Sequence, residues 1–135
     1  MEKVVPIDTA RKEVLSWVEF KKISEKRKSE LEGVIEMLAE NVSAGELSID
    51  PGTFEITQKL KFPLGENNAT NQLVFKPRIQ GYALQDAMSG VKFNDEIGKT
   101  FARISASTGV SVNIIKKMDS EDLAVSSNIA VFFTL

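Results

Sequence analysis

The middle of the chain alternates apolar and polar side chains, and this alternation restricts the fold more than any other feature of the sequence. After the turn signal Asp50-Pro51-Gly52, apolar residues recur at mostly even spacing from Phe54 to Phe62, which is typical of a strand with one solvent-facing side. The polar loop 65–71 follows, and then a second strand-like run that Pro77 ends by removing an amide donor. We therefore expect a small antiparallel β-hairpin whose edges other elements cover.

Helix-forming segments lie on both sides of this hairpin. The first runs from about Asp8 to about Ser43, contains no proline and one glycine, and is followed by Gly45, which suits a helix exit. After the hairpin, caps at Asn94 and Asp119 and glycine exits predict a bundle of three to four short helices. The sequence thus predicts one α+β domain over residues 1–135, with a long N-terminal helical segment (8–45), a β-hairpin (46–78) and a helical subdomain (79–135).

The N-terminal helical segment carries two apolar clusters, at residues 14–20 and 31–42. Between them lies KKISEKRKSE (21–30), in which Ile23 is the only apolar side chain. Such a stretch cannot be buried on all sides, so we expect a helix covered mainly at its two ends, with a break near Ser24. Its basic residues are interpreted as a solvated face with local ion pairs, and an acidic partner remains an alternative.

Three acidic residues, Asp119, Glu121 and Asp122, begin the last predicted helix. Asp119 is expected to cap the helix, and Asp122 stands three residues on, where the reciprocal partner of a capping box belongs. Paired carboxylates could also serve acid–base chemistry or hold a divalent cation. The helix start explains each residue by its position, and we prefer that interpretation.

The chain contains no cysteine and no histidine. This composition excludes disulfides, thiolate or imidazole metal sites and the commonest general base. The glycines lack the spacing of a phosphate-binding loop. We therefore expect a protein that is not an enzyme and uses no cofactor or metal. The longest aliphatic or aromatic run, Ile129 to Phe133, is too short to span a bilayer, and a net charge of −2 gives no overall attraction to nucleic acid or anionic lipid.

Residues 107–123 have the pattern of a helix-turn-helix. Gly109 in the turn, with Ile104 and Ile115 on either side, fits the packing of that motif. Its second helix would present Val112 to Lys117 to DNA, with asparagine and lysine side chains that suit base and phosphate contacts. Acidic residues border this stretch on both sides and would repel phosphates. A plain helical corner is the preferred interpretation, and a small DNA-binding regulator remains an alternative.

Four stretches follow one another in the second half of the chain: LKFPL (60–64), LVFKPR (73–78), ISASTGVSVNIIKKMDSEDL (104–123) and IAVFF (129–133). Taken in order, they resemble the tail assembly chaperones of contractile-tailed, Mu-like phages. The order and spacing of the stretches carry the resemblance, since no single one is specific. The resemblance covers Ile56 to Leu135, and the long N-terminal helix departs from the compact pattern of that family.

The resemblance implies a non-enzymatic assembly factor in the host cytoplasm. Such proteins coat the largely helical tape-measure protein, keep it soluble, help to recruit tail-tube subunits and are absent from the mature virion. In many of these phages a frameshift yields a longer product. A structural tail or baseplate subunit that is retained in the virion remains an alternative, and a homo-oligomer is left open.

A chaperone for a helical client needs an apolar groove or stripe with a polar rim. Our candidates for this partner-binding surface are apolar residues of the N-terminal segment, which could equally be ordinary core. They are Trp17, Phe20, Leu31, Ile35 and Leu38.

Overall fold

Three strands form one antiparallel sheet in the order β1-β2-β3. They are β1 (Leu47–Ile49), β2 (Ile56–Leu64) and β3 (Thr70–Phe75) in a computed structural model that describes residues 5–133. Buried and more exposed side chains alternate along the first half of β2, as its sequence predicts. The expected hairpin is confirmed as β2 and β3, and β1 adds a short third strand that the sequence did not predict.

The N-terminal helical segment is confirmed and consists of three helices, α1 (Ile7–Phe20), α2 (Glu25–Glu30) and α3 (Glu32–Ser43). The expected break near Ser24 lies between α1 and α2, where Lys22 adopts a left-handed φ of 57°. Ser24 then caps α2 by accepting a hydrogen bond from the backbone amide of Arg27 (3.1 Å). The chain thus doubles back, and α1 packs against α3.

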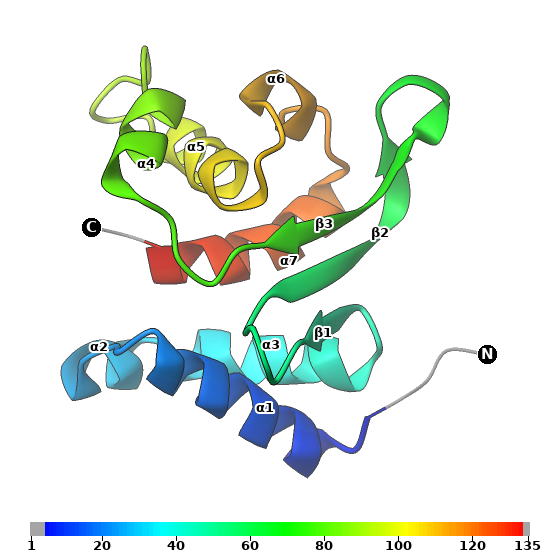
Figure 1. Ribbon diagram of the computed structural model, residues 1–135, viewed down its shortest axis with the longest axis vertical. Coiled ribbons are helices and arrows are strands. Elements are labelled where there is room, and N and C mark those ends of the chain that lie inside the picture. The colour runs from blue at the N-terminus through cyan, green and yellow to red at the C-terminus, as the bar shows by residue number, and fades with distance from the viewer. Residues whose placement is uncertain (1–4, 134–135) are drawn as a thin grey trace.

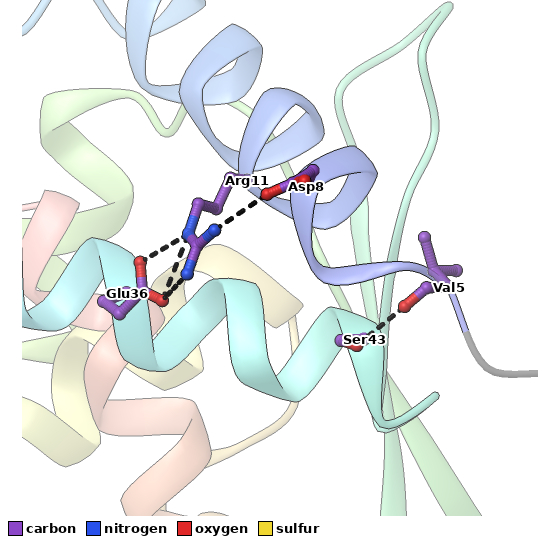
Figure 2. A network of polar contacts seen from close by, with 5 residues as sticks. All are labelled: Val5, Asp8, Arg11, Glu36 and Ser43. Atoms are coloured by element: carbon purple, nitrogen blue, oxygen red, sulfur yellow. Dashed lines mark hydrogen bonds and ion pairs between the residues drawn. The ribbon is translucent and has the colours of Figure 1, made fainter.

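Polar contacts join the first turns of α1 and the residues before it to α3 (Figure 2). The Arg11 guanidinium bridges Glu36 of α3, with Nη2 2.7 Å from Oε1, and Asp8 of α1, with Nη1 2.9 Å from Oδ1. At the other end of α3, the Ser43 hydroxyl donates to the Val5 carbonyl (2.6 Å).

The C-terminal half is helical, as expected. The helices α4–α6 lie at the end of the molecule opposite α1–α3, and α7 lies between the two groups (Figure 1). Asp95 rather than the predicted Asn94 caps α5, by accepting from the Gly98 amide (2.8 Å). Gly109 ends α5 with a left-handed φ of 78°. The elements are α4 (Gly81–Ala87), α5 (Glu96–Thr108), α6 (Val112–Ile115), α7 (Ser120–Ala130), and the 3-10 turns η1 (Glu66–Asn68) and η2 (Val131–Phe133).

The pairing of β2 with β3 is interrupted between Lys59 and Leu64, and α7 binds the strand there. Both carboxylate oxygens of Asp122 accept backbone amides of β2, one from Lys61 and one from Phe62, each at 3.0 Å. Asp119 caps α7 as predicted, through the Glu121 amide (2.9 Å). The predicted capping-box role of Asp122 is wrong, because its carboxylate is turned toward the unpaired amides of β2.

One apolar core joins both halves of the described chain. Trp17 of α1 meets the rings of Phe132 and Phe133 edge-on, with centroids 5.0 and 6.4 Å away. The same cluster contains Ile56 of β2 and Ile104 of α5. Within residues 5–133, no helix combines the length and the apolar character that crossing a membrane requires.

Candidate functional site

The five residues predicted to bind a partner do not form an exposed surface. Trp17 and Leu38 are each 1% exposed, and Leu31 and Ile35 are each 8% exposed. They lie in the core because α1 and α3 turn their apolar faces inward, Trp17 toward the C-terminal aromatic pair and α3 toward α7. These four side chains therefore pack in the core, and binding of a partner by them stays a prediction.

Phe20, the fifth candidate, is half-buried at the end of α1. Its ring stacks on Phe54, with centroids 4.6 Å apart and an interplanar angle of 18°. The Arg78 guanidinium lies 5.2 Å from the Phe20 centroid and donates to the Phe20 carbonyl (2.9 Å). Phe20 thus connects α1 to the turn before β2 and to the segment after β3, rather than presenting a free ring.

A groove does exist between α1 and the α2–α3 pair. This α1–α3 groove has a volume of about 330 Å³, and the apolar side chains Leu15 and Ile35 line it. Leu15 is exposed, whereas Ile35 is one of the five predicted residues and contributes only its edge. Charged and polar side chains form the rim, and these are Arg11, Glu25, Lys28, Ser29, Glu32 and Glu36.

The electrostatics of the groove depend on the Arg11 bridge at its wall. Arg11 donates from Nε as well as Nη2 to Glu36, a two-point contact that suits the planar guanidinium. The hydrogen bond from Arg11 holds the pKa of the Glu36 carboxyl below its usual value. The rim therefore keeps both signs of charge near neutral pH and surrounds an apolar floor.

A second cavity, of about 320 Å³, lies where the end of α1, the β3–α4 connection and η2 meet. In this cavity, the Lys21 pocket, the Lys21 ammonium donates to the Pro77 carbonyl (3.0 Å) and lies 3.7 Å from the Phe133 centroid. Burial, and to a smaller extent the charge of Arg78, lowers the pKa of Lys21 to about 8. The other lining residues are Ile23, Arg78, Ile79, Gln80, Gly81, Leu84 and Phe132.

The sequence did not predict the Lys21 pocket. Lys21 stands in a basic run that reads locally as a solvated helix face. Pro77 and Phe133, which surround its ammonium, come from distant parts of the chain. The local pattern carries no signal of this burial, since Glu25 at the i+4 position offers Lys21 an ordinary surface partner.

The helix-turn-helix stretch forms a tight corner. Ile104 and Ile115 are fully buried, as the packing pattern predicts. The second helix, α6, is only a four-residue turn, and Lys116 and Lys117 follow it on the exposed surface. The plain corner is confirmed, and DNA binding by this stretch stays a prediction that no contact tests.

Exposed apolar side chains gather along the segment from α4 to the start of α5. Phe93 is 92% exposed, and Tyr82 and Ile97 are also largely exposed. The Lys99 ammonium lies 4.7 Å from the Phe93 centroid, a cation–π contact at the surface. The sequence did not predict exposure of these residues, and single exposed apolar side chains are common on protein surfaces.

Two of the cavities formed by the described side chains combine apolar and charged groups. The α1–α3 groove has an apolar floor inside a charged rim, and the Lys21 pocket has two cations beside mostly apolar side chains. Both arrangements suit recognition of another molecule. Comparisons of the chain with models of protein families, with curated proteins and with solved structures find no match.

Proposed function

We propose that this chain is a tail assembly chaperone of a contractile-tailed phage that binds amphipathic helices of the tape-measure protein. The α1–α3 groove carries this proposal, since Leu15 and Ile35 can receive apolar side chains of a client helix. The mixed charges of the rim, such as Arg11 and Glu32, keep the groove soluble and can pair with the polar flanks of the helix. Recruitment of tail-tube subunits belongs to the same proposal.

Two independent features support the proposal. The resemblance to tail assembly chaperones lies in residues 56–135, whereas the groove is formed by residues 11–36. The volume of about 330 Å³ is at the lower end for ligand sites. A groove of this size receives side chains from one face of a helix, and the remaining surface of the client stays available to other chaperone copies.

The deciding experiment is co-expression with the tape-measure protein of the phage that encodes this chain, which the proposal requires to exist. We expect the client to become soluble and to co-purify with the chaperone. Leu15→Glu puts a charge on the groove floor, and Leu15 is 38% exposed, so the fold should persist while the co-purified client falls at least fivefold. Thermal unfolding of the free variant checks that the fold is retained.

Met37→Glu is the matched control, because Met37 is 47% exposed on α3 and does not line the groove. This variant should retain the client. If the wild-type chain neither solubilises nor retains the tape-measure protein, the proposal fails. If Met37→Glu weakens the complex as much as Leu15→Glu does, the groove is not the contact surface.

Mass spectrometry of purified virions separates the chaperone from a structural subunit. A chaperone acts in the host cytoplasm and leaves before the particle is complete, so its peptides should be absent from mature virions. Peptides in stoichiometric amounts with tail proteins would instead establish a retained tail or baseplate subunit.

A further inference from the structure

Two cationic groups line the Lys21 pocket, and its lining within residues 5–133 contains no carboxylate. The Lys21 ammonium and the Arg78 guanidinium both line it, and neither forms an ion pair with a carboxylate of residues 5–133. The Pro77 carbonyl and the Phe133 ring give the ammonium only partial compensation for its lost hydration. A cation pair in this setting attracts an anion that enters the pocket.

The guanidinium remains able to bind a ligand. Arg78 uses one nitrogen, Nη2, for the Phe20 carbonyl, and a guanidinium has five N–H donors. The stacking of this group on the Phe20 ring orients it. Two donors of different geometry, an ammonium and a planar fork, therefore border the same cavity.

Apart from Gln80 and Gly81, the rest of the lining is apolar. Ile79, Leu84 and Phe132 line the pocket, and Leu84 and Phe132 are themselves nearly buried. The cavity of about 320 Å³ is large enough for a small organic molecule. Inorganic anions would leave this apolar surface unused, whereas a ligand with a hydrocarbon body covers it.

We propose that the Lys21 pocket binds a small monocarboxylic acid with an apolar body. Its carboxylate lies against Lys21 and Arg78, and its hydrocarbon part packs on Ile79, Leu84 and Phe132. This site lies apart from the α1–α3 groove and is independent of the proposed chaperone function.

Isothermal titration calorimetry of the full chain with hexanoate tests the proposal. We expect saturable binding of one hexanoate per chain at pH 7. Acetate keeps the carboxylate but lacks the hydrocarbon chain, and 1-hexanol keeps the hydrocarbon chain but lacks the charge. Each should therefore bind at least tenfold more weakly than hexanoate. Hexanol binding as tight as hexanoate would show that the cations do not select the ligand, and would overturn the proposal.

Variants assign the binding to the pocket. Lys21→Met keeps most of the apolar stem and removes the ammonium, so hexanoate affinity should fall at least tenfold. Lys26→Met removes one charge from the same basic run outside the pocket, and its affinity should match the wild type. Arg78→Met is a second pocket variant that keeps the test decisive if Lys21→Met fails to fold. Unchanged affinity in a folded pocket variant, or no saturable hexanoate binding at all, overturns the proposal.

Proton uptake provides a readout that a merely structural lysine would not give. At pH 8 about half of the Lys21 side chains in the free chain are neutral, since the pKa of Lys21 is about 8. A bound carboxylate favours the charged ammonium and raises that pKa, so binding takes up protons and weakens as the pH rises above 8. Arg78 is the other charged group that lines the pocket, and it is the one that acts on Lys21. The apparent binding enthalpy in phosphate and in Tris should therefore differ at pH 8, and the difference should vanish in Lys21→Met.

Discussion

The carboxylate of Asp122 accepts backbone amides of β2 at the place where β2 does not pair with β3. The strand β2 leaves its register with β3 between Lys59 and Leu64, which frees backbone amides that folding must satisfy. Asp122 is 2% exposed and accepts two of these amides. Its own carbonyl accepts from the Gln58 side chain (2.9 Å), and Gln58 in turn accepts from the Ser126 hydroxyl. This buried polar network fixes the position of α7 on the sheet.

Replacement of Asp122 by alanine should therefore destabilise the fold. Two amides lose their acceptor, and we expect the free energy of unfolding in urea to fall by about 3 kcal/mol. Asp122→Asn retains one acceptor oxygen and should lose less. Glu121→Ala is the control, because Glu121 is exposed on the same turn and should change the stability by less than about 0.5 kcal/mol. Equal losses for Asp122→Ala and Glu121→Ala would contradict this role of Asp122.

The secondary-structure elements that the sequence predicts well are those with a local cause. Alternation in β2 and helix formers in the first 45 residues act over a few neighbouring positions, so the hairpin and the helices on both sides follow from them. The strand β1 has only three residues, too few for a periodic signal. Asp122 and Lys21 were misinterpreted because the groups that they contact lie far away in the chain. The five candidates for a partner-binding surface were chosen from helix faces that turn inward, so four of them lie in the core and only Ile35 also lines the α1–α3 groove.

The exit of α5 depends on backbone conformation at Gly109, which has a φ of 78°. An alanine there meets no neighbouring atom, so the cost of Gly109→Ala comes from the left-handed backbone and should be about 1 kcal/mol. Gly33 lies inside α3 and also has open space around it. Gly33→Ala should raise the stability by roughly 0.5 kcal/mol, because alanine favours helix. The thermal unfolding midpoint should therefore fall in Gly109→Ala and rise in Gly33→Ala, relative to the wild type. A rise in both variants would contradict the assigned role of Gly109.

At the scale of the whole molecule, the N-terminal helices and the C-terminal residues depend on one aromatic cluster. Trp17 of α1 contacts Phe132 and Phe133, and all three belong to the apolar core that also contains Phe75 of β3. The polar links between Arg11 and Glu36 lie at the surface and connect only α1 to α3. The union of the two helical groups therefore rests mainly on apolar packing.

Phe132→Ala should accordingly lower the stability of the N-terminal and the C-terminal helices together. Loss of this buried ring should reduce the free energy of unfolding by about 3–5 kcal/mol. Trp17 is the only tryptophan of the chain, so its fluorescence reports on α1 while far-UV circular dichroism reports on all helices. The two signals should show coincident transitions at lower denaturant than in the wild type. Tyr82→Ala, at an exposed position of α4, should leave the midpoint unchanged, and separate transitions in Phe132→Ala would mean that the helical groups unfold independently.

The contact between Trp17 and Phe132 also sets an order of events during synthesis. The ribosome completes α1 long before Phe132 and Phe133 leave its exit tunnel, so the indole initially lacks the rings that cover it. Closure of such a long loop makes the final step of folding slow relative to the formation of single helices. A nascent chain of this protein thus carries Trp17 without these two rings until translation has passed Phe133.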